Sequence, residues 1–168
     1  EDRLTCVMAC GTGKTLVSLW MAEKLDCQKI LVLVPSLALL RQTLHEWMKE
    51  TRFEQLSCLS VCSDPTVQKG LDEWMVEQCD LDFPVSTDSQ MVKEFLRQET
   101  EAIKIVFSTY QSAHVVADGM EESDAFDFAV FDEAHRTAGR QGTKFSFALS
   151  DENLLIRKRL FMTATPRR

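Results

Sequence analysis

The sequence predicts an α/β domain in which a mostly parallel sheet is covered by helices on both faces. Two observations support this prediction: short apolar runs alternate with helix-like stretches along the 168 residues, and clusters of polar residues follow the ends of the apolar runs. Strands that alternate with helices form βαβ units, whose strands lie parallel in one sheet. With 45% apolar and 27% charged residues, the chain can bury a core of ordinary size. We therefore treat residues 1–168 as one domain.

The first third of the chain alternates regularly between the two kinds of element. The predicted strands are residues 4–9, 30–34 and 56–62, and the predicted helices are residues 14–25 and 37–50. The run ILVLV at residues 30–34 is apolar throughout, as is typical of a strand buried on both faces. In the second helix, leucines and a tryptophan recur at helical spacing, which predicts one apolar face.

The remaining elements are interrupted by an acidic segment. Residues 63–102 contain ten acidic and three basic residues, and we expect helices near 71–79 and 89–99 with a short strand near 84–86. Further strands are predicted at residues 103–107, 128–131 and 160–163, with a helix at 110–117. The acidity of the segment predicts that its face lies away from phosphate backbones.

Charge and hydropathy exclude some functional classes. The net charge is −7, which does not indicate a general nucleic-acid binder, but residues 136–168 carry eight basic and two acidic residues and could form a local basic face. No apolar run approaches the roughly eighteen residues that span a membrane. We therefore expect a protein with no membrane partner.

The cysteines indicate an intracellular protein. There are six: Cys6, Cys10, Cys27, Cys58, Cys62 and Cys79. None forms a CxxC pair, which disfavours a zinc site. We expect them to be reduced, mostly buried thiols in a cytoplasmic protein.

A glycine-rich turn between the first strand and the first helix is a candidate phosphate-binding loop. Its residues are Cys10, Gly11, Thr12, Gly13, Lys14 and Thr15. Glycines allow consecutive N–H groups to point at phosphate oxygens, and the helix that follows directs its positive end to the same place. Lys14 would reach the β- and γ-phosphates of ATP, and the Thr15 hydroxyl would bind Mg²⁺. The alternative is a simple glycine turn with a capping threonine, which would not need this strand–loop–helix setting.

Two adjacent carboxylates follow the strand at 128–131. Asp132 could bind Mg²⁺, Glu133 could orient and deprotonate a water molecule, and His135 could report the nucleotide state to a neighbouring segment. An Asp-Glu pair alone is weak evidence, because most such pairs are surface charges. After an apolar strand and downstream of a phosphate loop, it indicates a phosphoryl-transfer site.

Polar clusters follow five of the predicted strands, at residues 11–15, 35–36, 108–111, 132–133 and 163–166. In open parallel sheets, ligands bind outside the carboxyl ends of the strands. We therefore expect all five clusters to lie at one edge and to form a single composite site.

These clusters resemble the motifs of superfamily-2 helicases and translocases, in their first RecA-like lobe. Residues 11–15 resemble motif I, 34–42 motif Ia, 132–135 the DEAH form of motif II and 163–165 motif III, while 108–112 resemble the next nucleic-acid-facing motif. The usual GxxxxGKT pattern has glycine where Met8 stands, and the helicase variant does not require it. The residues at 8–15 and 33–36 are most similar to those of motor subunits of restriction–modification systems and related bacterial helicases. The resemblance implies a three-layer αβα, RecA-like P-loop domain spanning residues 1–168.

The resemblance also implies a mechanism and its residues. ATP and Mg²⁺ would be bound by the phosphate loop with Asp132 and Glu133. The expected nucleic-acid contacts are Pro35, Ser36, Arg41, Ser108 and Thr109, and the expected coupling residues are Thr163 and Thr165 with His135. Arg41 could instead be a solvated helical arginine, and Ser36 could equally cap a helix.

The expected partners are nucleic acid, DNA rather than RNA, and a second helicase lobe with further domains. Without the arginine that family members bring from the second lobe, the chain alone is expected to hydrolyse ATP poorly. Two alternatives stay open: a P-loop kinase acting on a small molecule, and a nucleotide-binding interaction domain without motor activity.

Overall fold

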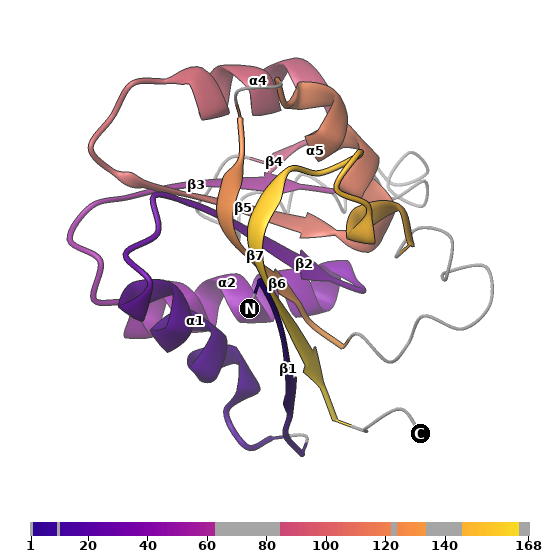
Figure 1. The fold of residues 1–168 in the computed structure, drawn as a ribbon. Helices are drawn as coiled ribbons and strands as arrows, with labels where there is room; N and C mark the ends of the chain where they lie inside the picture. The colour runs from indigo at the N-terminus through magenta and orange to yellow at the C-terminus, as the bar shows by residue number, and fades with distance from the viewer. Residues whose placement is uncertain (1, 10, 63–84, 122–123, 134–145, 165–168) are drawn as a thin grey trace, which may run out of the picture.

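Among the residues that the structure describes, seven strands form one sheet whose paired strands are all parallel (Figure 1). The structure is a computed structural model, and it describes residues 2–9, 11–62, 85–121, 124–133 and 146–164. The strands are β1 (Arg3–Val7), β2 (Lys29–Val34), β3 (Leu56–Val61), β4 (Val85–Ser86), β5 (Ile103–Thr109), β6 (Phe126–Phe131) and β7 (Ile156–Thr163). Their order in the sheet is β1-β7-β6-β2-β5-β3-β4, so the parallel sheet predicted from the sequence is confirmed.

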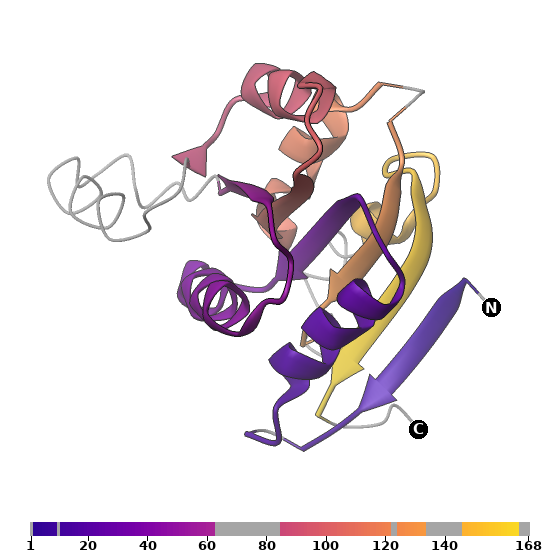
Figure 2. The same cartoon turned by 90° about the vertical axis from the view of Figure 1, so that its left-hand side faces the viewer.

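Helices cover both faces of this sheet. They are α1 (Lys14–Lys24), α2 (Leu37–Glu50), α4 (Ser89–Arg97) and α5 (Ala113–Gly119), with a 3-10 turn, η2 (Tyr110–Ser112), before α5. Figure 1 shows α1 and α2 on one side of the sheet and α4 and α5 on the other, and Figure 2 shows β1 at the edge beyond β7. The three-layer arrangement is therefore confirmed.

Strand β2 lies in the middle of both cores. Ile30, Val32 and Val34 belong to the core beneath α1 and α2, whereas Leu31 and Leu33 belong to the core beneath α4 and α5. All five are fully buried. Burying one such side chain contributes about 1.5–3 kcal/mol to stability, which explains why a continuous apolar run marks a central strand.

Two elements differ clearly from the expectations in their bounds. The helix expected at 110–117 begins as the 3-10 turn η2 and continues as α5 to Gly119. Strand β7 starts at Ile156, earlier than the expected residue 160. The prediction missed this start because charged residues follow Ile156. The helix expected at 71–79 lies outside the described residues, while α4 and β4 confirm the neighbouring predictions.

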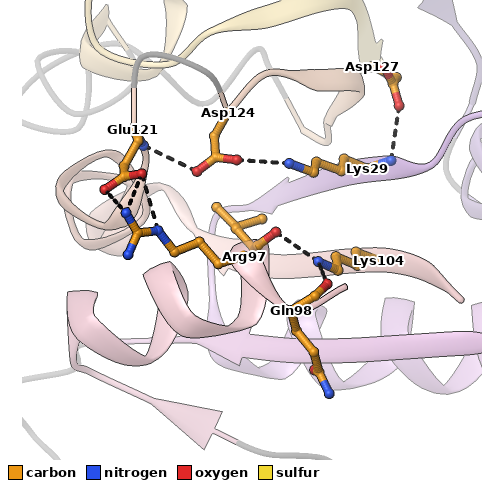
Figure 3. Close-up of polar contacts among 8 residues, drawn as sticks. Lys29, Arg97, Gln98, Lys104, Glu121, Asp124 and Asp127 are labelled. Atoms are coloured by element: carbon orange, nitrogen blue, oxygen red, sulfur yellow. Dashed lines mark hydrogen bonds and ion pairs between the residues drawn. The ribbon is translucent and has the colours of Figure 1, made fainter. Parts of the chain in front are cut away.

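A polar network fastens α4 and the end of α5 to the amino ends of the central strands (Figure 3). The buried Lys104 amine donates to the carbonyl oxygens of Leu96, over 2.7 Å, and Gln98, both at the end of α4. Lys29 pairs with Asp124 over 2.8 Å, and the Asp124 carboxylate also accepts from the Glu121 N–H. Because these groups lie opposite the carboxyl ends of the strands, they stabilise the fold away from the candidate site.

Gly119 sits where α5 meets α4. A Cβ added there would lie 2.6 Å from both the Ser89 carbonyl oxygen and the Val92 Cβ. We expect Gly119→Ala to lower the free energy of unfolding by about 1–3 kcal/mol, as overpacking usually does. Urea denaturation would measure the loss, and Asp118→Ala, at the exposed neighbouring position, is the matched control. An unchanged midpoint for Gly119→Ala would contradict this account of the helix contact.

The described cysteines Cys6, Cys27, Cys58 and Cys62 are reduced thiols. Burial raises the pKa of Cys27 to about 11 and that of Cys58 to about 12, so both stay protonated near neutral pH. Cys10 and Cys79 lie outside the described residues. Within the described ranges, no helix has the length and apolar character to cross a membrane.

Candidate active site

The carboxyl ends of the strands meet at one edge of the sheet, as the sequence predicts. Hydrogen bonds join segments that are far apart in the chain: the Met8 N–H donates to the Thr163 carbonyl oxygen over 3.0 Å, and the Asp132 N–H donates to the Leu33 carbonyl oxygen over 2.9 Å. The Tyr110 hydroxyl donates to the Asp132 carbonyl oxygen over 2.7 Å. The polar ends of β1, β2, β5, β6 and β7 therefore form one connected surface.

The phosphate loop has the backbone shape that its glycines permit. Gly11 and Gly13 have φ angles of 77° and 87°, in the left-handed region that favours glycine. Apart from their chain neighbours, no described residue has an atom within 4 Å of where their Cβ atoms would be, so the described structure leaves the space beside the loop open. The Thr12 hydroxyl donates to the Ala9 carbonyl oxygen over 2.7 Å, and α1 begins at Lys14. The predicted loop residue Cys10 lies outside the described residues.

The loop lysine and the acidic pair are in contact. Lys14 Nζ lies 2.8 Å from Glu133 Oε1, and the two side chains are only 9% and 13% exposed. Glu133 has a φ of 51°, a backbone conformation that costs free energy in any residue other than glycine. The same turn bends the chain so that the Glu133 N–H donates to Asp132 Oδ1 over 2.9 Å. Lys14, Asp132 and Glu133 are thus brought together from opposite ends of the sequence.

A small pocket lies between α1, α2 and the sheet. Its lining combines polar and apolar side chains: Lys14, Thr15, Ser18, Val32, Thr43, Val130, Asp132 and Met162. The oxygen donors Thr15 and Asp132 suit Mg²⁺, which is usually held by one or two protein groups together with phosphates and water. Among the described residues there is no group of three or more His, Cys, Asp or Glu side chains that could hold a metal ion.

Burial raises the pKa of the Asp132 carboxyl; the hydrogen bond from the Glu133 N–H opposes this and the Glu133 charge adds to it. A carboxyl with a raised pKa costs folding free energy while it is ionised, and the cost disappears as the pH falls through the raised pKa. We therefore expect Asp132→Asn to raise Tm at pH 7 by about 2 °C, as removal of a functional charge often does. The gain should shrink at pH 5, where more of the wild-type carboxyl is protonated.

Thermal unfolding followed by circular dichroism at both pH values would check this expectation. Asp118→Asn, at an exposed position of α5, should leave Tm unchanged. A lower Tm for Asp132→Asn at pH 7 would show that the ionised carboxylate stabilises the fold.

Two residues of α2 contact the site, and the sequence did not identify either of them as a site residue. The fully buried Trp47 donates from Nε1 to the Thr15 carbonyl oxygen over 3.1 Å, and its ring meets Phe107 edge-on at 5.7 Å. Thr43, 4% exposed, lines the pocket one turn earlier. In the sequence, Trp47 is one more apolar position of an amphipathic helix, and only the packing of α2 against α1 shows its contact with Thr15.

The segments expected to face nucleic acid are at the same edge, with one qualification from the structure. Ser36 caps α2 by accepting a hydrogen bond from the Leu39 N–H over 3.3 Å. Ser108 and Thr109 are buried: the first hydroxyl donates to the Thr109 carbonyl oxygen and the second bonds to Ser112 Oγ, each over 3.0 Å. Their side chains therefore do not face outward here, whereas Gln111 and His114 just beyond them are exposed.

The remaining predicted residues are placed only in part. Pro35 precedes the N-cap of α2, and the partly exposed Arg41 lies within α2, just after its first turn. Thr163 is 6% exposed, at the end of β7, and its carbonyl oxygen accepts from Met8 beside the phosphate loop. His135 and Thr165 lie outside the described residues. The roles proposed for all these residues stay predictions.

Known proteins match this chain over nearly its whole length. A family model described as "Type III restriction enzyme, res subunit" matches residues 1–168. A probable helicase of African swine fever virus, isolate Pretoriuskop, is 31% identical over 168 residues, which are 99% of this chain and 17% of that protein. The chain therefore spans about one-sixth of the curated relatives it matches.

Two solved structures have the same fold. One is a nuclease-deletion mutant of the Type ISP restriction–modification enzyme LlaGI in complex with a DNA substrate mimic, with a TM-score of 0.77 and 34% identity over 100% of this chain and 16% of that one. The other is the ATP-dependent Type ISP restriction–modification enzyme LlaBIII bound to DNA, with a TM-score of 0.78 and 34% identity over 99% of this chain and 12% of that one. The resemblance seen in the motifs thus extends to the arrangement of the sheet and helices.

Proposed function

Since this chain belongs to the family of the type III restriction enzyme res subunit, we propose that it is the first, ATP-binding lobe of a motor that hydrolyses ATP while it translocates along DNA or unwinds it. Its RecA-like fold places the phosphate loop and the acidic turn side by side. The observation that carries the proposal is the 2.8 Å contact between Lys14 and Glu133, beside Asp132. A loop lysine beside two carboxylates at the carboxyl ends of parallel strands suits the binding of a triphosphate with Mg²⁺.

The contacts suggest how nucleotide binding changes the site. Lys14 pairs with Glu133 in this structure and would have to exchange that partner for the phosphate oxygens of ATP. The exchange would release the Glu133 carboxylate to orient and deprotonate the attacking water. Thr15 and Asp132 would hold Mg²⁺, which supplies charge neutralisation on the phosphates. In this proposal Lys14 and Glu133 restrain each other until ATP arrives.

The DNA backbone would pass over the same edge of the sheet. The N-terminus of α2, capped by Ser36, presents N–H groups suited to a phosphate, and Arg41 lies near it. Beyond β5, the exposed Gln111 is better placed for such a contact than the buried hydroxyls of Ser108 and Thr109. These contacts would position the strand without reading its sequence.

The rest of the motor would be supplied by other parts of a longer protein. The relatives are about six times longer than this chain, which supports a second lobe and further domains as partners. The ATP and DNA named for the two Type ISP enzymes support ATP and DNA as ligands here. We propose a cytoplasmic motor whose isolated first lobe hydrolyses ATP poorly, since an arginine from the second lobe would be missing.

ATP hydrolysis by the full-length protein, with and without DNA or RNA, tests the proposal. A motor should be stimulated by nucleic acid, and strand-displacement and triplex-displacement assays would then separate unwinding from translocation. Turnover that no nucleic acid changes would refute the motor and favour a P-loop kinase of another class. Absence of ATP binding and turnover would favour an interaction domain.

A further inference from the structure

Tyr110 connects the end of β5 to Asp132 across the end of β2. Its hydroxyl donates to the Asp132 carbonyl oxygen over 2.7 Å, although β2 lies between β5 and β6 in the sheet. Neighbouring strands lie about 4.8 Å apart, so the side chain and its hydrogen bond together cover roughly two strand spacings. The contact joins two segments that the sheet itself keeps apart.

The Tyr110 ring packs against other aromatic rings beside the site. It stacks on Phe131, with centroids 6.5 Å apart and planes at 29°, and Phe131 in turn packs on Phe161 at 4.9 Å. Burial raises the pKa of the Tyr110 hydroxyl, and the charges of Asp132 and Glu133 raise it further. The hydroxyl therefore stays protonated and remains a hydrogen-bond donor at neutral pH.

The segment on which Tyr110 stands is internally bonded. The hydroxyls of Thr109 and Ser112 bond to each other across the first turn of η2, over 3.0 Å, and Ser108 bonds to the Thr109 carbonyl oxygen. Both hydrogen bonds are buried, so water does not compete for them. A force on the exposed Gln111 would thus move the segment as a unit, including Tyr110.

The receiving end of the contact is poised to change. Asp132 is held on both sides, by the Leu33 carbonyl oxygen at its N–H and by Tyr110 at its own carbonyl oxygen. The next residue, Glu133, has the unfavourable φ of 51° and pairs with Lys14. A strained residue next to a firmly bonded one is a position where a small shift of the backbone can change the conformation.

We propose that Tyr110 is a positioning residue that transmits the binding of nucleic acid at residues 108–112 to Asp132 and Glu133. The inference rests on the proposed function, since it requires one chain that binds both nucleotide and nucleic acid. The sequence predicts Thr163, Thr165 and His135 as coupling residues. Tyr110, which directly follows β5, would be a second link between the two sites. By reciprocity, the same link lets bound nucleotide change the affinity for nucleic acid.

Tyr110→Phe in the full-length protein tests the proposal, because it removes the hydroxyl and keeps the ring on Phe131. The first measurement is the Kd for duplex DNA with and without a non-hydrolysable ATP analogue and Mg²⁺; the second is kcat and KM for ATP with and without DNA. Coupling between sites is typically about 5- to 150-fold in affinity. We expect Tyr110→Phe to bring this factor to within about twofold of one, and to lower the stimulation of kcat about tenfold while KM for ATP changes less than twofold.

Ser86→Ala is the matched control. It also removes one buried hydroxyl, which bonds to the Asp88 backbone at β4, on the far edge of the sheet. It should keep the wild-type coupling and stimulation. A wild-type coupling factor in Tyr110→Phe, or an equal loss in Ser86→Ala, would overturn the role of Tyr110. If the wild-type protein itself shows neither stimulation nor coupling, the proposed function fails and this inference fails with it.

Discussion

Lys14→Ala should abolish DNA-stimulated ATP hydrolysis in the full-length protein. In the proposed mechanism the amine meets the phosphates, and alanine removes its positive charge and its hydrogen bonds from the site. Removing one such preorganised donor typically lowers kcat about 100- to 1000-fold. The variant also leaves Glu133, 13% exposed, without the lysine partner that lies 2.8 Å away. We therefore expect some loss of thermal stability as well, measurable as a lower Tm.

Steady-state ATP hydrolysis at saturating DNA, together with thermal unfolding, would measure both effects. Lys24→Ala is the matched control, because Lys24 is an exposed lysine in the last turn of the same helix. It should leave kcat unchanged. DNA-stimulated turnover by Lys14→Ala at more than about a tenth of the wild-type rate would contradict the assignment of the loop as the phosphate site.

Glu133→Gln should stop turnover and keep ATP bound. Glutamine has nearly the same shape and can still accept a hydrogen bond from Lys14, but it cannot take a proton from water. Loss of a general base lowers the rate by about 100- to 10,000-fold. Since binding of ATP does not need that base, we expect Kd for ATP to change less than about threefold.

Single-turnover hydrolysis and equilibrium binding of ATP would separate the two effects. Glu101→Gln, at an exposed position before β5, is the control for loss of one negative charge. Because Lys14 and Glu133 are in contact, the double variant should lose much less than the product of the two single losses. Multiplicative effects would mean that the two residues act independently.

Much of the fold could be predicted from local patterns. The run at residues 30–34 identified a central strand because a strand that is buried on both faces needs apolar side chains at every position. The order of the strands in the sheet could not be predicted in this way. A strand has the same local pattern whether it pairs with the next strand in the sequence or with a distant one. That β1 pairs with β7, and β2 with both β5 and β6, depends on packing of the whole chain.

The candidate site divides along the same line. Glycines, the loop lysine and the acidic pair carry their chemistry in their residue types and spacing, so the sequence pointed to them directly. Trp47 and Tyr110 contact the backbone of Thr15 and Asp132 through tertiary packing, and no local pattern predicts either contact. The inward turn of the Ser108 and Thr109 hydroxyls was also hidden, because serine and threonine side chains are equally at home facing water or a neighbouring carbonyl group.

The pairing of the first strand with the last has a consequence for synthesis on the ribosome. β1, which leads into the phosphate loop, pairs with β7 alone, and Leu4 lies beside Leu160, more than 150 residues later in the chain. The pairing of β1 with β7 closes a long loop, which is slow. During synthesis this pairing waits until residue 163 has left the ribosomal tunnel. A nascent chain that stalls before that point would lack the strand pairing that holds β1 at the edge of the sheet.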